Sequence, residues 1–213
     1  AVEQEGKTTV SARKFLDICR ALPANGTISF KAQDNKALVK AGKSRFSLST
    51  LPSEDFPDSE GANYTDEISL PQSALKSLLD ETSFAMASQD VRYYLNGLLL
   101  EREEATLRAV ATDGHRLAMG SLTTSNKVTD KNSLIIPRKA ILELGRLLND
   151  SDENVTIAFS SQQIKVELSD LNFTSKLIDG QFPNYQRVLP VGGDKEVIAE
   201  RDQLKKALSR AAI

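Results

Sequence analysis

The stretch "KAILELGRLL", residues 139–148, decides how the chain is organised, because a variant of it, "RKFLDICRAL", occurs at residues 13–22. The two segments align without gaps and place apolar residues over apolar residues at helical spacing. The matched pairs are Phe15 with Ile141, Leu16 with Leu142, Ile18 with Leu144 and Leu22 with Leu148. Both segments are therefore predicted to be amphipathic helices, 11–22 and 137–148, the second starting at a proline that a first helical turn tolerates.

The repeat continues downstream in the same order. "TISF" (27–30) matches "TIAF" (156–159), and "SRFSLSTLPSEDFP" (44–57) matches "LNFTSKLIDGQFP" (171–183), so each copy ends in Phe-Pro. A second match joins "ALKSLLDETSF" (74–84) to "QLKKALSRAAI" (203–213). These matches predict the back half of one unit at 1–65, a complete unit at 66–190, and a linker with the opening helix of a third unit at 191–213. We therefore expect a longer protein that extends past both ends of this sequence.

Within the complete unit the pattern predicts two helices and a mostly antiparallel set of strands, an α+β fold. The helices are expected at 71–84 and 137–148, and the strands at 91–100, as a pair across 106–122, and at 154–160, 163–169 and 171–178.

Composition excludes several classes of function. The apolar runs are far shorter than the roughly 20 residues that cross a bilayer, and the N-terminus shows no secretory pattern, so we expect a cytoplasmic protein without a membrane partner. With one cysteine, Cys19, and one histidine, His115, no Cys/His zinc cluster can form, and no calcium-binding loop is present. We expect no metal and no cofactor.

The net charge of -2 hides an uneven distribution. Segments 11–22, 137–148 and 199–212 each carry a net charge of +2, whereas 71–84 carries -1 and the rest of the chain is acidic. Basic helices suit a surface that contacts phosphates without reading bases. The alternative is that these lysines and arginines only solvate the helices.

"ATDGHRLAMG", residues 111–120, contains the single histidine. Asp113 and His115 could form a catalytic pair, but Asp-Gly between strand-like residues favours a two-residue hairpin turn in which Asp113 caps its own turn and Thr112 faces His115. Val110, Thr112, His115 and Leu117 would then share one face. This patch suits either a peptide-binding pocket or packing within the domain, and both alternatives stay open.

Two further segments attract attention. In "SQDVRYYLNG" (88–97), Tyr93 and Tyr94 on a strand would point to opposite faces, so at most one is a core residue and the other could meet nucleic acid. Asn96-Gly97 is either a turn or a bulge. "FPNYQRVLP" (182–190) is expected to be an inter-domain linker.

The strings "QDVRYYLNG" (89–97), "ATDGHRLA" (111–118), "IPRK" (136–139) and "FTSKLIDGQFPNYQRVLP" (173–190), in this order, resemble the bacterial sliding clamp family, the beta subunits of DNA polymerase III. The resemblance extends over essentially the whole chain. It implies the DNA clamp fold and a non-catalytic processivity factor that encircles and slides on duplex DNA. It also implies a homodimeric ring when the protein is full length. The implied partners are double-stranded DNA without sequence preference, the polymerase III alpha subunit, the clamp loader, and other polymerases and repair proteins that dock through short linear motifs.

The resemblance also assigns residues to three surfaces. The DNA contacts it implies are Gln89, Arg92, Tyr93, Tyr94 and Lys139. The implied wall of a hydrophobic peptide cleft is Leu95, Thr112, Gly114, His115, Arg116, Leu117, Pro183, Arg187 and Val188. The implied dimer interface is Arg45, Phe46, Leu48 and Ile213. In the family the C-terminal tail of the third domain completes the cleft, so this chain by itself is expected to hold an incomplete peptide site.

Two other functions compete with this one. A hydrolase that uses Asp113 and His115 predicts that His115→Ala abolishes turnover, whereas a clamp predicts weaker partner binding only. A plain nucleic-acid binding module without a ring predicts a monomeric full-length protein.

Overall fold

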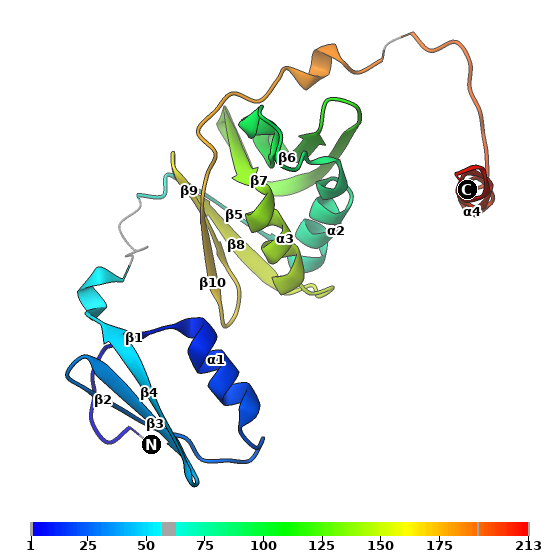
Figure 1. Cartoon of the computed structure of the whole chain (residues 1–213). Coiled ribbons are helices and arrows are strands. Elements are labelled where there is room, and N and C mark those ends of the chain that lie inside the picture. Colours follow the sequence, from blue (N-terminus) through cyan, green and yellow to red (C-terminus); the bar gives the residue numbers. More distant parts are fainter. Residues whose placement is uncertain (1, 57–62, 191, 213) are drawn as a thin grey trace. The chain divides into compact units, whose positions relative to one another are not determined.

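The computed structural model describes residues 2–56, 63–190 and 192–212. The chain divides into two compact units, Ala1–Asn63 and Tyr64–Ile213, called unit 1 and unit 2 below (Figure 1). Its helices and antiparallel sheets confirm the α+β fold that the sequence predicts.

Unit 1 is one helix packed on a four-stranded antiparallel sheet of order β1-β4-β3-β2. Its elements are β1 (Thr9–Val10), α1 (Ala12–Ala21), β2 (Ser29–Gln33), β3 (Lys36–Ala41), β4 (Ser44–Leu51) and the 3-10 turn η1 (Ser53–Asp55). Ala37, Val39 and Leu48 are buried, and Phe15 and Ile18 of α1 cover them. α1 itself contains no buried residue, so this core is thin.

Unit 2 holds two antiparallel sheets, one of order β10-β9-β8-β5 and one formed by β6 and β7. Its strands are β5 (Asp66–Pro71), β6 (Gly97–Thr112), β7 (Leu117–Pro137), β8 (Asn154–Phe159), β9 (Gln163–Glu167) and β10 (Asn172–Lys176). Its helices are α2 (Gln72–Asp80), α3 (Arg138–Leu147) and α4 (Arg201–Ala211), with 3-10 turns η2 (Ser83–Ala85), η3 (Tyr93–Leu95) and η4 (Tyr185–Arg187).

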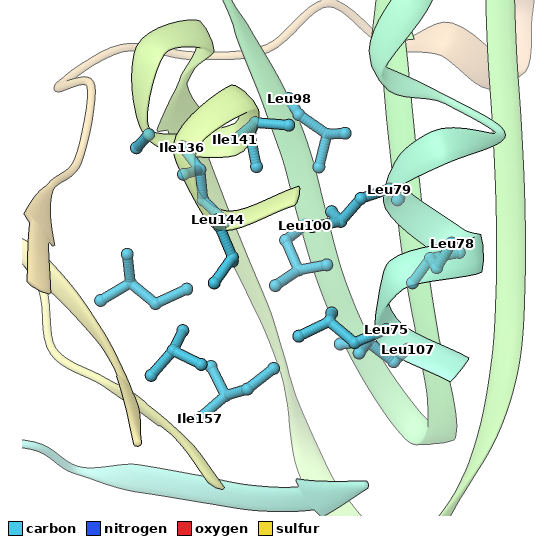
Figure 2. Close-up of a cluster of buried hydrophobic side chains, with 14 of the residues drawn as sticks. Leu75, Leu78, Leu79, Leu98, Leu100, Leu107, Ile136, Ile141, Leu144 and Ile157 are labelled. Atoms are coloured by element: carbon cyan, nitrogen blue, oxygen red, sulfur yellow. The ribbon is translucent and has the colours of Figure 1, made fainter. Parts of the chain in front are cut away.

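The main core of unit 2 lies where α2 and α3 meet the sheets, and leucine and isoleucine side chains from all of them point into it (Figure 2). It includes Leu75 and Leu79 of α2, Ile141 and Leu144 of α3, Leu98 and Leu107 of β6, Ile136 of β7 and Ile157 of β8. Each fully buried side chain of this size contributes about 1.5–3 kcal/mol through the hydrophobic effect.

The repeat seen in the sequence is present in the structure as a helix followed by three antiparallel strands, α1-β2-β3-β4 and α3-β8-β9-β10. One row of paired residues crosses each sheet: Phe30, Val39 and Phe46 in unit 1, and Ile157, Val166 and Phe173 in unit 2. This register aligns Phe30 with Ile157, whereas the match of "TISF" to "TIAF" paired Phe30 with Phe159. The two-residue shift keeps the same side chains facing the core because strands have a period of two.

β6 bends sharply at Glu104. Arg108 and Glu101 form an ion pair of 3.4 Å although seven extended residues would span about 23 Å. Glu104 has a φ of 51°, and the register with β7 shifts on both sides of it. The segments 97–102 and 106–112 therefore lie close together, and each pairs with its own part of β7.

The predicted strand at 91–100 is wrong in its first half. Tyr93–Leu95 forms a 3-10 turn and the strand begins at Gly97. The amide of Asn96 closes this loop, accepting from the Asp90 N–H at 2.9 Å and donating to the Asp90 carbonyl at 2.8 Å. Gly97 then passes so close to β7 that a Cβ would lie 2.6 Å from the Ile136 carbonyl oxygen, which settles the open alternative in favour of a close backbone approach.

Candidate functional site

The hairpin tip between β6 and β7 is a four-residue loop, 113–116, and not the two-residue turn that the sequence favours. Thr112 pairs with Leu117, so His115 belongs to the loop. The Asp113 carboxylate accepts the N–H groups of His115 at 2.9 Å and Arg116 at 3.0 Å. The Thr112 hydroxyl accepts the Gly114 N–H at 3.0 Å and donates to the Arg116 carbonyl at 2.7 Å. These side-chain bonds satisfy a wider loop, as Asp and Thr commonly do in turns.

The expectation that Asp113 caps its own turn is confirmed. The hydrogen bonds from the backbone N–H groups of Arg116 and His115 lower the pKa of Asp113 to about 2. Its second oxygen accepts from Arg116 Nε at 3.1 Å. No hydrogen bond of the described residues joins this carboxylate to the His115 ring. The pair therefore lacks the orientation that a general base requires.

A second loop, 88–97, lies against this tip. Arg92 donates through Nε and Nη2 to Asp90 at 3.0 and 2.8 Å, and its Nη2 also reaches the Asp113 carbonyl at 3.2 Å. The side-chain and backbone hydrogen bonds from Arg92 lower the pKa of Asp90 to about 2. Gly114 has a φ of +89°, and a Cβ there would lie 3.0 Å from Arg92 Nη1. Arg92 thus fixes the hairpin tip against the loop.

A cavity of about 490 Å³ opens between the two loops. It is lined by Phe84, Met86, Ala87, Ser88, Gln89, Asp90, Arg92, Asp113, His115, Arg116 and Arg138. Phe84 is 56% exposed, and the Arg116 guanidinium lies 5.6 Å from the centre of its ring, within cation–π range. Such a half-apolar, half-cationic cavity can take a peptide side chain together with a carboxylate.

A second cavity of about 350 Å³ borders α3 and is basic. It is lined by Ser88, Gln89, Asn96, Arg138, Lys139, Leu142, Glu143 and Arg146. Gln89 and Arg138 line both cavities. Three cationic side chains around one hollow can bind phosphate oxygens.

Family models match both parts of the chain. The model of the DNA polymerase III beta subunit N-terminal domain matches residues 1–60, and that of the central domain matches residues 69–184. The chain belongs to the DNA polymerase III beta subunit family. This confirms the resemblance drawn from the sequence motifs.

Similar proteins carry the same description. The beta sliding clamp of Pseudomonas aeruginosa is 53% identical over 99% of this chain and 57% of the relative. The crystal structure of the DNA polymerase III subunit beta from the same organism has a TM-score of 0.90 at 54% identity, covering 96% of this chain and 56% of that one. The sliding clamp of Bacillus subtilis has a TM-score of 0.92 at 28% identity, covering 100% of this chain and 56% of that one. The chain therefore has the clamp fold and spans somewhat over half the length of these relatives.

The DNA contacts that clamp membership implies fall into two groups. Gln89 and Lys139 line the basic cavity beside α3. Arg92 points instead to Asp90 and the hairpin tip. Tyr93 is exposed, whereas Tyr94 is half-buried against a small cluster below, with the two rings edge-on at 5.7 Å. One tyrosine is exposed and the other packed, as expected, but a 3-10 turn and not a strand separates them.

The residues expected in the clamp's peptide cleft are also unequal. His115, Arg116 and Gly114 are exposed at the hairpin tip, and Pro183, Arg187 and Val188 are exposed on the segment 182–189. Leu117 and Thr112 are half-buried, and Leu95 is buried, so Leu95 can shape the cleft only from beneath.

The residues expected at the clamp's dimer interface lie on β4. Beyond β3, this strand pairs only with β1, at Leu51 and Thr50, so its edge at residues 44–49 has no strand beside it in the described chain. Arg45 is exposed, Phe46 half-buried and Leu48 buried. Leu48 would therefore contribute backbone and not side chain. Ile213 lies outside the described residues.

Sequence reasoning missed Phe84, Met86 and Arg138, which line the 490 Å³ cavity. Arg138 donates from Nη1 to the Met86 carbonyl at 3.2 Å and thereby joins the start of α3 to the 84–92 loop. The only signal in the sequence is the position of Arg138 directly after Pro137, which marks the first turn of a helix.

The described residues contain no group of three or more His, Cys, Asp or Glu side chains placed to bind a metal ion. None of the helices in the described ranges is long and apolar enough to cross a membrane.

Proposed function

We propose that the full protein is a sliding clamp: a non-catalytic homodimeric ring that encircles duplex DNA and holds the replicative polymerase on its template. Family membership, and relatives named beta sliding clamps, support this. The ring would also serve the clamp loader, other polymerases and repair proteins, whose short peptide motifs compete for one cleft. The proposal places the protein in the cytoplasm with the replication machinery.

The observation that carries the proposal is the use of Asp113. Its carboxylate is occupied by the backbone of its own turn, while the same turn presents exposed His115 and Arg116 at the rim of the 490 Å³ cavity. This arrangement spends the Asp–His pair on building a rigid contact surface. A hydrolase would need the carboxylate on the imidazole instead.

The basic cavity beside α3 supports the DNA-binding part. Lys139, Arg138 and Arg146 surround it, and no rigid base-reading groups accompany them. Contacts to phosphates alone are independent of sequence and allow a protein to slide. The open edge of β4 at residues 44–49 supports the ring, since a strand of a second protomer can pair with it.

The decisive experiment loads the full-length protein on nicked circular DNA and on the same DNA after linearisation, with the clamp loader of the same organism. We expect long retention on the circle and rapid loss from the linear form, and restored retention when bulky proteins block both ends. Equal loss from circle and line would contradict the ring.

A second experiment measures binding of the purified polymerase III alpha subunit to the full-length protein. His115→Ala is expected to weaken binding several-fold without changing retention on circular DNA, because the histidine contacts partners and not DNA. A hydrolytic activity that disappears in this variant would favour the competing function.

A further inference from the structure

The segment 182–189 is attached to unit 2 mainly through one residue, Tyr185. The side chains of Pro183, Asn184, Gln186, Arg187 and Val188 are exposed, whereas Tyr185 is only 6% exposed. Its ring packs with Leu99, Val110 and Ile135 of the β6–β7 sheet, and Phe182 and Leu189 cover the edges of this cluster. A segment without helix or strand structure is thus held by a single buried anchor flanked by two weaker ones.

The hydroxyl of this anchor binds a buried carboxylate. Tyr185 Oη donates to Glu101 Oε2 at 2.5 Å, and Glu101 is only 5% exposed. A hydrogen bond from a hydroxyl to a carboxylate is among the strong types in proteins. Burying Glu101 costs free energy that its partners must offset, so the carboxylate has a high demand for this donor.

Two cations complete the group. Arg108 Nη1 lies 3.4 Å from Glu101 Oε2 and donates to Tyr185 Oη at 3.3 Å, while Lys131 Nζ lies 3.0 Å from Glu101 Oε1. Burial would raise the pKa of Glu101, but the hydrogen bonds from Tyr185, Lys131 and Arg108 outweigh it and lower the pKa. Burial and the bond to Glu101 raise the pKa of Tyr185, so the phenol stays protonated as the donor at neutral pH.

The position of Tyr185 determines that of its neighbours. η4 is a single 3-10 turn in which the Val188 N–H donates to the Tyr185 carbonyl at 3.1 Å. Arg187 and Val188 therefore follow the backbone of Tyr185 directly. Leu117, from the base of the hairpin tip, packs in the same cluster as Tyr185, which links the segment to the His115 loop.

We propose that Glu101 and Tyr185 are positioning residues for the peptide cleft. Their buried hydrogen bond holds the 182–189 segment at a fixed place beside the hairpin and thereby sets the affinity for partner peptides. The inference rests on the peptide-docking part of the proposed function.

The test uses the full-length protein and the purified polymerase III alpha subunit as probe, with binding followed by surface plasmon resonance. Tyr185→Phe keeps the ring and removes the hydroxyl; loss of one charge-assisted hydrogen bond is expected to weaken binding by up to about tenfold. The loss should lie mainly in faster dissociation. Amide hydrogen exchange should quicken in 182–189 and stay unchanged in α2 and α3.

Glu101→Gln provides a second, independent variant that keeps the size of the side chain. If the two residues act as one unit, the double variant binds about as weakly as either single variant, so the effects are not additive. Tyr64→Phe is the matched control, because the Tyr64 hydroxyl is also buried but makes no hydrogen bond among the described residues. It should bind the alpha subunit like the unaltered protein.

The outcomes separate the two proposals. Normal binding by Tyr185→Phe, or strictly additive losses in the double variant, would overturn the inference and leave the clamp function standing. Loss of binding accompanied by faster exchange throughout α2 and α3 would also overturn it, since the role would then be structural. Failure of the unaltered protein to bind the alpha subunit would overturn the peptide-docking function and this inference with it.

Discussion

Phe30 in unit 1 and Ile157 in unit 2 occupy equivalent places in two equivalent sheets, yet Phe30 is 42% exposed and Ile157 is 1% exposed. The rest of their rows is alike: Val39 and Val166 are fully buried, and Phe46 and Phe173 are half-buried. The difference arises at one edge. Ile157 pairs with Ile68 of β5 on its other side, whereas β2 is the edge strand of its described sheet.

The same contrast holds for the helices. Ile141 and Leu144 of α3 are buried under α2 and β6, while the equivalent Phe15 and Ile18 of α1 are only half-buried. A helix on three strands therefore produces the fold of the half-unit, but a β5-α2-β6 layer is what turns its apolar face into a core. The comparison teaches that the same sequence pattern yields different stability according to what packs on it.

The largest expected effect tests this contrast directly. Ile157→Ala should destabilise unit 2 by about 3 kcal/mol, because it leaves a cavity in a closed core. Phe30→Ala should cost unit 1 clearly less, about 1–2 kcal/mol, because much of the ring already meets water. Amide hydrogen exchange of the whole chain, followed separately in each unit, measures both. Equal losses would show that exposure at this position does not govern stability.

The next prediction asks whether the repeat extends to DNA. Lys139 and its repeat partner Arg13 are both exposed near the start of their helices. In the full-length protein each change to Ala should lower the slope of log affinity against log salt by about 0.9, because one phosphate contact is lost. Fluorescence anisotropy with duplex DNA measures this, and Lys40→Ala on β3 serves as control. An unchanged slope for Arg13→Ala would restrict DNA binding to unit 2.

A smaller effect concerns Gly145 in α3, whose repeat partner in α1 is Cys19. A Cβ at Gly145 would meet no atom within 4 Å, and the residue lies inside a helix. Gly145→Ala should stabilise unit 2 by about 0.5–1 kcal/mol by reducing the freedom of the unfolded chain. Urea unfolding followed by circular dichroism tests this. A destabilised variant would mean that α3 needs the glycine for a contact outside the described residues.

The smallest effect is the pH response of the hairpin tip, a feature of unit 2 that has no counterpart in unit 1. Because the pKa of Asp113 is lowered to about 2 in the folded state, its contribution to stability is present above pH 4 and is lost as pH falls through about 2. NMR titration of the Asp113 carboxyl carbon should give a midpoint near 2. A midpoint near 4 would mean that the turn does not hold the carboxylate in solution.

The sequence by itself determined the repeat, the helices and the use of Asp113. Apolar residues at helical spacing predicted helices at 11–22 and 137–148, and the structure has α1 and α3 there within one residue or two. These features depend on local periodicity and on bonds between near neighbours, which the sequence shows directly. The motifs from 89 to 190 were enough to identify the clamp family.

Only the tertiary structure decided the details of the sites. The 3-10 turn at Tyr93, the bend of β6 at Glu104 and the four-residue tip at 113–116 depend on partners such as Asn96, Arg92 and β7. The Tyr185–Glu101 bond joins residues 84 positions apart, and no pattern in either segment foretells it. Such contacts are chosen by the free energy of burying polar groups with their partners, which exists only once the chain has folded.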